Sequence, residues 1–289
     1  MAAIISRFAP APTGYLHLGH IVNAVCVWRE TRARNGRILL RIEDHDRQRS
    51  RLEFEAAMVE DLAWLGFAAD EPPVRQSERG AIYEAALDGL RRRGLVYACA
   101  CTRSDVTRAR AGALFQGRLN NGDPDRGDPE RVALQKSDLR YPGTCADLGL
   151  PEGPGLGLRV RLAPSVERFV DLRRGPQTQR PSEQCGDLLL RDRDGNWTYQ
   201  FAATVDDHRQ GVTLVIRGDD LLASTGRQMQ LGRLLGRPEP PEFLHHRLIM
   251  KSPTQKLSKS DGDTGIRELR ARGWTPSQVI DAAMAAVST

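Results

Sequence analysis

The stretch Arg7–His20, RFAPAPTGYLHLGH, sets His17 and His20 one helical turn apart behind a run rich in proline and glycine. The residues AAIISRF that lead into it predict a short buried strand, and APAPTG predicts a stiff loop ending in a turn. From about Leu18 to Arg34 the apolar spacing predicts a helix, which Asn35-Gly36 ends. The stretch therefore predicts a strand–loop–helix unit, the building block of an α/β fold.

Strands and helices continue to alternate beyond this unit. RILLRIED (37–44) and LVYACAC (95–101) predict strands, and residues 50–66, 77–93 and about 223–235 predict helices. LGLRVRLA, DLLLRDRDGNWTYQFAATV and GVTLVIRG continue the alternation, with a hairpin turn at Asp194-Gly195. A short last helix is predicted with Thr275 as its N-cap and Pro276 as its first residue. We expect a Rossmann-like parallel sheet.

This alternation breaks after Cys101. Residues 107–138 are polar, weakly periodic and rich in Gly, Pro, Asp and Arg, which indicates an insertion. We expect segments 1–98 and 151–248 to form the two halves of one α/β domain, with an inserted region (99–150) between them and a lysine-containing loop with a helical stem (249–289) after them.

The composition is that of an ordinary soluble globular protein, with 40% hydrophobic and 27% charged residues in 289. No apolar run is long enough to cross a membrane, and the N-terminus does not resemble a secretory signal. Five cysteines without framework spacing favour a reducing cytoplasm. A net charge of +5 suits a nucleic-acid partner without proving one.

Lysine is rare and clustered. Four lysines occur among 42 basic residues, and Lys251, Lys256 and Lys259 lie close together. Lysine is a flexible point charge of the kind that grips phosphates. A solvated basic loop explains the cluster equally well.

The two histidines admit three interpretations. A zinc site needs a carboxylate or thiolate close by, and none adjoins His17 and His20 in the sequence. A core position fits poorly with a turn that opens a helix, which is where α/β sheets bind ligands. The N–H groups and dipole of a helix start favour a phosphate, and Gly19 lets a flat ligand approach the backbone. From these residues alone, phosphate and core roles remain comparable.

Two motifs carry a resemblance that separates these roles. HLGH (17–20) resembles the HIGH motif of class I aminoacyl-tRNA synthetases, and KLSKS (256–260) resembles their KMSKS motif. In that family both motifs bind ATP, with Mg²⁺ accompanying the nucleotide. The resemblance therefore implies that His17, Gly19, His20, Lys256 and Lys259 bind ATP, with His17, His20 and Lys259 stabilising charge at the reacting phosphorus.

Further stretches resemble glutamyl-tRNA synthetases in order along the chain: RFAPAPTGYLHLGH, LLRIEDHDRQRS, DLAWLGF, QSERGAIYEAAL, TYQFAATVDDHRQGVTLVIRGDDLLAST and KLSKS. The chain continues only about 30 residues beyond the KLSKS stretch, so we expect it to lack the large anticodon-binding region. In this it is similar to the family of short paralogues, the glutamyl-Q tRNA(Asp) synthetases.

The resemblance implies a glutamate pocket. Arg7 and Arg217 would bind the side-chain carboxylate, Glu43 the ammonium group, and Tyr199 would line the pocket with Ala9 and Ala11. Arginine suits this task because it donates two parallel hydrogen bonds and keeps its charge, although either arginine alone fits a surface ion pair. The family usually has serine at position 11 and often asparagine at position 203, whereas this chain has alanine at both.

Cysteine spacing suggests a structural zinc site. Cys99 and Cys101 form a CxC, and Tyr141 and Cys145 follow after the insertion. A lone CxC is more often incidental, and three thiolates need a fourth ligand. The short paralogues carry a similar CxC with YxxxC, which implies that the tyrosine oxygen is the fourth ligand. Cys26 and Cys185 are expected to be core residues.

The resemblance implies a ligase that activates L-glutamate with ATP and transfers it to queuosine in the anticodon of tRNA(Asp). We expect a cytoplasmic monomer. The alternatives are a truncated glutamyl-tRNA synthetase that charges a tRNA 3′ end, another HxGH nucleotidyltransferase, and a catalytically silent tRNA-binding paralogue. Intact His17, His20 and Lys259 disfavour silence, and the four glutamate-pocket residues disfavour a different nucleotidyltransferase.

Overall fold

The computed structural model describes residues 3–45, 49–109, 140–252, 255–256 and 265–288. Its α-helices include α1 (Leu18–Arg32), α2 (Leu52–Trp64), α3 (Gly80–Arg91), α6 (Pro181–Gln184), α7 (Tyr199–Arg209), α8 (Thr225–Leu234), α9 (Ile266–Ala271) and α10 (Pro276–Ser288), and its 3₁₀ helices include η1 (Gln76–Glu78) and η2 (Asp219–Ser224). Its strands are β1 (Ile5–Phe8), β2 (Arg37–Ile42), β3 (Val74–Arg75), β4 (Val96–Cys99), β5 (Gly157–Val160), β6 (Glu167–Asp171), β7 (Gly175–Gln179), β8 (Leu188–Arg191), β9 (Leu214–Gly218), β10 (Glu242–His246), β11 (Met250–Ser252) and β12 (Gln255–Lys256).

The main sheet is parallel, as predicted. β2 lies between β1 and β3, and β10 lies between β9 and β6, all in parallel pairs. The N–H of Thr213, directly before β9, donates to the carbonyl oxygen of Ile5 in β1 at 2.8 Å, which joins the two groups of strands. β7 adds an antiparallel edge strand, where Pro176 removes no hydrogen bond from the interior of the sheet.

Helices cover both faces of this sheet. Successive side chains of a strand point to opposite faces. Phe8 of β1 packs edge-on against Trp28 of α1, with ring centroids 5.7 Å apart. Its neighbour Arg7 pairs with Asp207 of α7 on the other face. The sheet therefore lies between α1 and α7.

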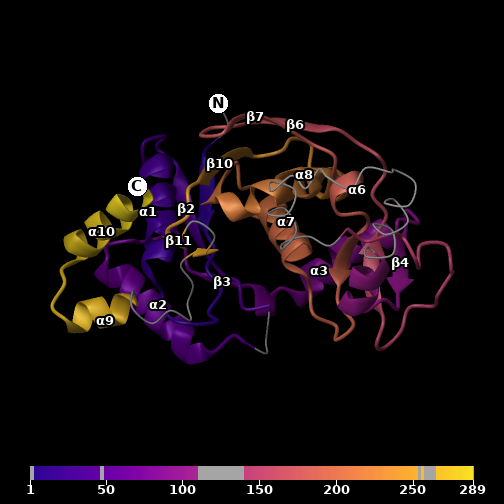
Figure 1. Ribbon diagram of the computed structural model, residues 1–289, viewed down its shortest axis with the longest axis horizontal. Helices are drawn as coiled ribbons and strands as arrows, with labels where there is room; N and C mark the ends of the chain where they lie inside the picture. Colours follow the sequence, from indigo (N-terminus) through magenta and orange to yellow (C-terminus); the bar gives the residue numbers. More distant parts are fainter. Residues whose placement is uncertain (1–2, 46–48, 110–139, 253–254, 257–264, 289) are drawn as a thin grey trace, which may run out of the picture.

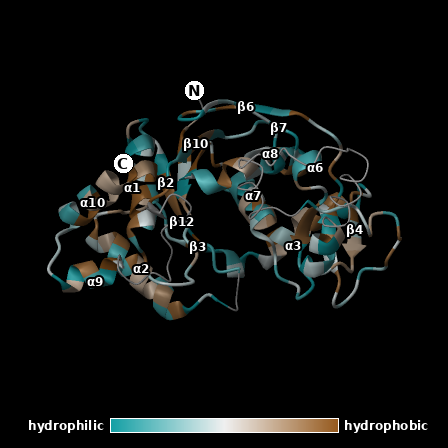
Figure 2. Cartoon of the chain, viewed as in Figure 1, coloured by the Kyte–Doolittle hydropathy of each residue, from teal (hydrophilic) through white to brown (hydrophobic). Residues whose placement is uncertain are grey.

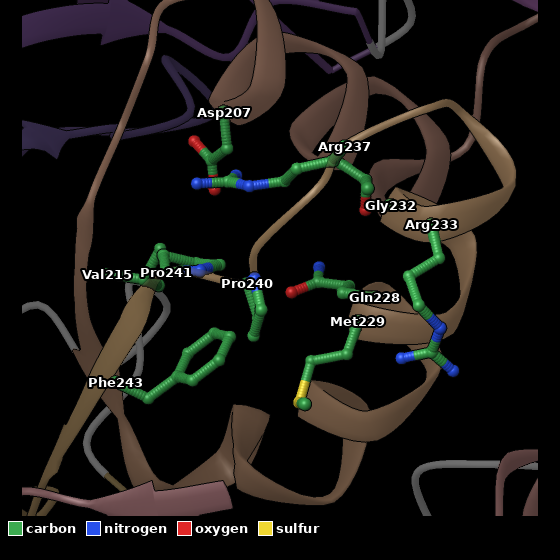
Figure 3. Close-up of a pocket in the computed structure, with 11 residues that line it drawn as sticks. Asp207, Val215, Gln228, Met229, Gly232, Arg233, Arg237, Pro240, Pro241 and Phe243 are labelled. Carbon is green, nitrogen blue, oxygen red and sulfur yellow. The ribbon is translucent and has the colours of Figure 1, made fainter.

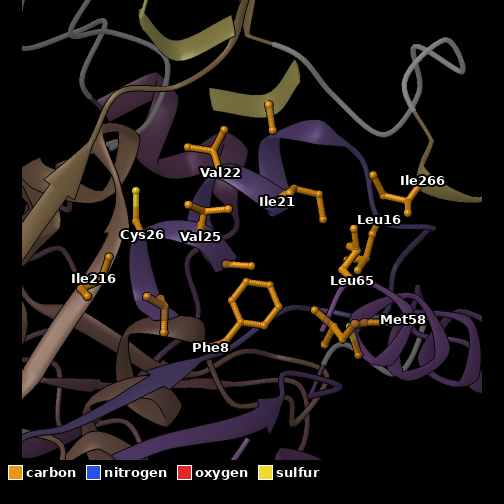
Figure 4. Packing of buried hydrophobic residues seen from close by; sticks show 14 of the residues in the cluster. Phe8, Leu16, Ile21, Val22, Val25, Cys26, Met58, Leu65, Ile216 and Ile266 are labelled. Atoms are coloured by element: carbon orange, nitrogen blue, oxygen red, sulfur yellow. The ribbon is translucent and has the colours of Figure 1, made fainter. Parts of the chain in front are cut away.

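A large apolar core fills the α1 side of the sheet. Figure 4 shows Phe8 of β1 and Ile216 of β9 beside Ile21, Val22 and Val25 of α1. The C-terminal helices close this core, since Ile266 and Leu269 of α9 and Val279 and Ala283 of α10 belong to the same buried cluster. In Figure 2, α9 and α10 carry both hydrophobic and hydrophilic stretches, as expected of helices that bury one face.

The cap of α10 is the predicted one: the hydroxyl of Thr275 accepts the N–H of Gln278 at 3.3 Å, and Pro276 is the first helical residue. Ile280 and Val287 are partly buried against the core as well.

A second, smaller sheet lies at the opposite end of the molecule from α10 (Figure 1). β5 lies between β4 and β8 and is antiparallel to both. Its strands pack with α3, α7 and α8 in a separate apolar cluster. The expected boundary at 98/99 falls within β4, and the expected boundary at 150/151 falls between β4 and β5 of this same sheet. The division of the chain into four segments therefore stays a prediction.

Three parts of the structure differ from the sequence-based expectation. The alternating stretch after the Asp194-Gly195 turn is helix α7 from Tyr199 onward. Because residues 201–207 are all buried, the sequence of this helix shows no separate polar and apolar faces. The hairpin β6–β7 and the helix α9 lie in segments with no predicted element. The greater part of the predicted insertion (110–138) and Lys259 lie outside the described residues. Among the described residues, no helix is both long and apolar enough to span a membrane.

Candidate active site and candidate metal centre

The predicted substrate residues meet at the carboxyl ends of the parallel strands, where α/β sheets bind ligands. Arg7 is the third residue of β1, Glu43 directly follows β2, Arg217 is the fourth residue of β9, and Tyr199 begins α7. We call these four residues, together with His17 and His20, the strand-end site. Arg7, Glu43 and Arg217 are 4%, 6% and 3% exposed, so this is a built interior site.

Both histidines cap helix α1. Nδ1 of His17 accepts the N–H of Gly19, and Nδ1 of His20 accepts the N–H of His17, each at 3.1 Å. Because each Nδ1 accepts a backbone hydrogen, the proton of each neutral ring sits on Nε2. The two rings lie 3.9 Å apart between centroids at the positive end of the helix dipole. The arrangement can offer two imidazole N–H donors to an anion at this helix start.

Gly19 is constrained by the first of these rings. A Cβ at position 19 would lie 2.9 Å from Cε1 and 3.0 Å from Nδ1 of His17. We predicted that Gly19 admits a ligand to the backbone. The structure adds a different reason for glycine, because the His17 ring fills the space that a side chain would need.

The two ends of the chain meet at the same helix start. Gly265, which directly follows residues 257–264, forms an isolated antiparallel bridge with His17. The N–H of Ile266 donates to the carbonyl oxygen of Leu16 at 2.9 Å. On the other side of that segment, Lys256 pairs with Met250 in the β11–β12 hairpin. The segment that directly follows residues 257–264 is thus held at the start of α1, whereas Lys259 itself lies outside the described residues.

A buried charge network supports the first arginine. Nε of Arg7 donates to Oδ1 of Asp207 at 3.0 Å, and Nη1 of Arg41 donates to the same oxygen at 2.7 Å. Arg41, which is 0% exposed, also donates to Oε1 of Glu43 at 3.1 Å. Burial opposes ionisation of Asp207, but the charges of Arg7 and Arg41 lower its pKa to about 2. Asp207 therefore stays ionised and fixes Arg7 and Arg41 together.

Glu43 supplies a second carboxylate to the network of Arg7, Arg41 and Asp207. Burial raises its pKa, and the charge of Arg41 is the strongest opposing influence. Its N–H donates to the carbonyl oxygen of Pro10 at 3.0 Å, which ties the end of β2 to the loop that carries Ala9 and Ala11. Both alanines are half-buried there. A carboxylate at this place is able to receive a substrate ammonium group.

The second arginine has neutral partners. Nε of Arg217 donates to Nε2 of His245 at 3.0 Å, Nη1 to Oε1 of Gln228 at 2.6 Å and Nη2 to the hydroxyl of Thr225 at 2.8 Å. Tyr199 lies within electrostatic reach of Arg217, Glu43, Arg7 and Asp207, which brings all four predicted pocket residues together.

The difference between the partners of Arg7 and those of Arg217 determines which charges a bound ligand would meet. Asp207 balances Arg7, whereas the hydrogen-bond partners of Arg217 in the described chain are uncharged near neutral pH. The site therefore offers a guanidinium charge for an anionic group and a carboxylate for a cationic one. An amino acid with an acidic side chain fits both.

Ala203 lies inside α7 and is only 1% exposed. The structure thus places this departure from the usual family pattern in the core, four residues after Tyr199.

The predicted zinc ligands also meet. The sulfur atoms of Cys99, Cys101 and Cys145 all lie within 4.8 Å of one another. The hydroxyl of Tyr141 lies 3.5 Å from Sγ of Cys99 and accepts the N–H of Cys145 at 2.8 Å. We call these four residues the cysteine cluster. The three cysteines could hold a metal ion, and thiolates are ligands that zinc prefers.

Arg159 adds a positive charge to this cluster. Its Nε donates to Sγ of Cys99 at 3.3 Å, and its guanidinium stacks 3.7 Å from the centroid of the Tyr141 ring. Burial raises the pKa of Cys101 to about 11, so its thiolate needs compensation from a cation. Arg159 places its positive charge at the neighbouring thiol of Cys99, and a divalent metal would compensate the Cys101 thiolate.

A cavity of about 630 Å³ has residues of both regions in its wall. Tyr199, Cys101 and Arg159 all line it. The amide oxygen of Gln200, which also lines this cavity, is buried without a hydrogen-bond partner in the described part of the chain.

Figure 3 shows a smaller hollow, whose wall includes Asp207, Gln228, Met229 and Phe243. Asp207 and Gln228 also accept hydrogen bonds from Arg7 and Arg217. It belongs to the support of the pocket and does not contain the predicted substrate residues.

Sequence reasoning missed several supporting residues. Arg41 stands inside the apolar strand RILLRI, and this isolated charge was a signal for a buried ion pair. Asp207 and His245 gave no such signal, because each has a role only through a partner distant in the sequence. Arg159 likewise lies in an alternating strand where a solvent-facing arginine is ordinary.

Comparison with known proteins gives a consistent picture. A family model described as "tRNA synthetases class I (E and Q), catalytic domain" matches residues 3–285. A protein of Rhodobacter capsulatus named glutamyl-Q tRNA(Asp) synthetase is 39% identical, and the match covers 96% of this chain and 98% of that protein. A protein of the same name from Bordetella bronchiseptica is 44% identical over 89% of this chain and 75% of its own length.

Among solved structures, the fold is similar to a glutamate tRNA ligase from Elizabethkingia meningosepticum in complex with its amino acid. The TM-score is 0.71 at 30% sequence identity over 91% of this chain. The match spans 53% of that ligase, so this chain corresponds to about half of it.

Proposed function

Because the chain belongs to the class I tRNA synthetases for glutamate and glutamine, and within them to the glutamyl-Q tRNA(Asp) synthetase family, we propose that it activates L-glutamate with ATP. The product is glutamyl-adenylate with release of pyrophosphate. The glutamyl group then passes to queuosine in the anticodon of tRNA(Asp).

One observation supports this proposal: Tyr199 lies within electrostatic reach of Arg7, Glu43 and Arg217, and the helix that follows β1 begins with the capping residues His17 and His20. In the proposed complex, Arg217 and Arg7 hold the side-chain carboxylate and Glu43 receives the ammonium group. The α-carboxylate then points toward the α-phosphate of ATP. The Nε2–H groups of His17 and His20, with Lys259 and Lys256, stabilise the charge that grows on the phosphate oxygens.

Glutamate-dependent exchange between ATP and pyrophosphate in the absence of tRNA tests the activation step. We expect exchange with glutamate and little with glutamine, since an amide does not match two guanidinium groups. Lys259→Ala should lower the rate by about 10²–10³, the effect of removing one donor to a developing anion. An absence of exchange in the wild type would leave only a tRNA-binding role.

The acceptor is tested separately with labelled glutamate. Transfer is expected to tRNA(Asp) that contains queuosine and not to the same tRNA lacking it. A modified base in a single-stranded loop can enter a pocket more easily than a base in a duplex. Charging of the 3′ end of tRNA(Glu) would instead identify a truncated glutamyl-tRNA synthetase.

Two metals complete the proposal. Cys99, Cys101, Cys145 and Tyr141 hold one structural zinc, and the donor set and the nearby Arg159 support this assignment. Mg²⁺ accompanies ATP and helps to neutralise the phosphates. We propose that the protein works as a monomer in the cytoplasm, and the five free thiols support the reducing compartment.

A further inference from the structure

Three neighbouring strands of the main sheet align Arg217, His245 and Asp171 in one row. β10 lies between β9 and β6, and His245 of β10 is the direct register partner of Arg217 in β9. Asp171 is the last residue of β6 and adjoins β10 through Phe243. The side chains of His245 and Asp171 are both 0% exposed. Neither residue belongs to the pocket that the sequence predicted.

Hydrogen bonds along this row fix the state of the imidazole. Nε of Arg217 lies 3.0 Å from Nε2 of His245, and Nδ1 of His245 lies 2.6 Å from Oδ2 of Asp171. Arginine has no acceptor, so its Nε donates and Nε2 of His245 accepts. The ring proton must therefore sit on Nδ1 and point at Asp171.

Asp171 is itself held by the backbone. Its carboxylate accepts the N–H groups of Arg173 at 3.0 Å and Arg174 at 2.8 Å, and that of His245 at 3.1 Å. These donors lower the pKa of Asp171 against the effect of burial, with the His245 ring the largest contributor. The acceptor at the end of the row is thus an immobile carboxylate.

Arg217 is fixed on its other sides as well. Gln228 and Thr225 of α8 accept from Nη1 and Nη2, so each of the three guanidinium nitrogens has a defined partner. None of these partners carries a charge when His245 is neutral. The contrast is Arg7, whose Nε donates directly to the carboxylate of Asp207.

We infer that Asp171 and His245 are positioning residues for glutamate recognition: they orient Arg217 through a neutral imidazole and leave its charge available to the substrate carboxylate. This inference rests on the proposed function, because it takes Arg217 as a glutamate-binding residue. A direct carboxylate partner would orient the guanidinium equally well but would neutralise it. Because the His245 ring lies between Arg217 and Asp171, the guanidinium is oriented without being neutralised.

The charged groups around His245 agree with a neutral ring. Burial lowers the pKa of His245 to about 4, and the charge of Arg217 acts in the same direction. Asp171 and Asp219 oppose this shift without reversing it.

The first test reads the tautomer directly. Ring nitrogen NMR shifts of the ¹⁵N-labelled full chain at pH 7.5, with the His245 signals identified by their loss in His245→Gln, should show a neutral ring protonated on Nδ1. A ring protonated on Nε2, or on both nitrogens, overturns the inference. This measurement does not depend on activity.

The second test separates positioning from a purely structural role. His245→Leu removes the acceptor and the donor at similar volume, and His245→Gln restores an amide that can do both. Losing a hydrogen bond to a charged group corresponds to roughly a 10- to 150-fold effect. The KM for glutamate in the exchange assay should therefore rise at least about tenfold in His245→Leu and less in His245→Gln. The KM for ATP should stay within about twofold, and the preference for glutamate over glutamine should fall.

His208→Gln is the matched control, since His208 lies on α7 outside the row and should keep wild-type kinetics. A glutamate KM unchanged in His245→Leu, or an equal rise in the KM values for glutamate and ATP, overturns the inference. If the wild type shows no exchange, the proposed function fails, and the tautomer measurement alone decides whether the row exists.

Discussion

The strand-end site and the cysteine cluster are assembled in different ways. Arg7 meets Asp207 across 200 residues of sequence, and the network around them is enclosed by a sheet, α7 and buried ion pairs. The cysteine cluster joins Cys99 to Tyr141, 42 residues away, and Cys101 to Cys145, 44 residues away. Within the described residues its buried apolar cluster is small and consists of Cys99, Val106, Tyr141 and Cys145. The first region is organised by the fold itself. In the second, the proposed zinc would add its binding free energy to these few apolar contacts.

Of the variants considered, Asp207→Ala should have the largest effect on the strand-end site. It leaves Arg7 and Arg41 buried without their shared carboxylate, which is expected to cost about 3–5 kcal/mol of unfolding free energy. Urea unfolding measures this cost. Glutamate-dependent exchange should fall more than about 100-fold, because Arg7 and Glu43 lose their fixed positions.

Asp207→Asn is the matched variant, because it keeps the shape and one acceptor while removing the charge. We expect a smaller loss of stability and an elevated glutamate KM. Wild-type kinetics in both variants would contradict the assigned role of the network.

Gly19→Ala should perturb the helix start with an intermediate effect. The added Cβ meets the His17 ring at 2.9–3.0 Å, so the ring and its cap must move. Loss of a cap is worth about 0.5–2 kcal/mol in thermal or urea unfolding. Exchange should fall about tenfold, the change expected when one donor to the phosphate is misplaced.

Gly89→Ala provides the control. Gly89 lies within α3, where the nearest atom to an added Cβ is a terminal nitrogen of Arg92 at 4.0 Å. This variant should be unchanged in exchange and stabilised by up to about 1 kcal/mol, the usual gain in a helix. A similar loss of exchange in both variants would show that Gly19 has no special position.

Cys145→Ser should have the smallest effect on exchange. Metal analysis of the wild type should find about one zinc per chain, and the variant should lose it. Exchange is expected to stay within about threefold, because of the residues proposed to bind glutamate only Tyr199 shares a cavity wall with the cluster. Transfer to tRNA should fall more than activation.

Cys26→Ala, in the apolar core of α1, should retain zinc and serves as the control. A collapse of exchange together with zinc loss would show that the two regions are not independent.

Much of the first unit could be predicted because its signals are local. The strand before Arg7, the helix after His17 and its end at Asn35 depend on neighbours within one or two turns, and Asn35 has the positive φ of 52° that ends such a helix. The caps at His17 and Thr275 likewise involve contacts of two or three residues.

Helix α7 could not be predicted from the sequence, because its burial on all sides removes the alternation of polar and apolar faces. In α7, all residues from Phe201 to Asp207 are buried, so apolar and charged positions no longer mark two faces. Asp206 is tolerated inside because Arg79, Gln76 and Tyr83 donate to it from another part of the chain. No local window contains that information.

The sequence alone determined which chemical groups are present: two imidazoles at a helix start, arginines and a glutamate at strand ends, and three thiols with a phenol. Only the tertiary structure decided how these groups are charged and oriented. Asp207 neutralises one arginine while His245 leaves another charged, and this distinction arises because electrostatic interactions depend on distance and burial, which contacts between remote segments create.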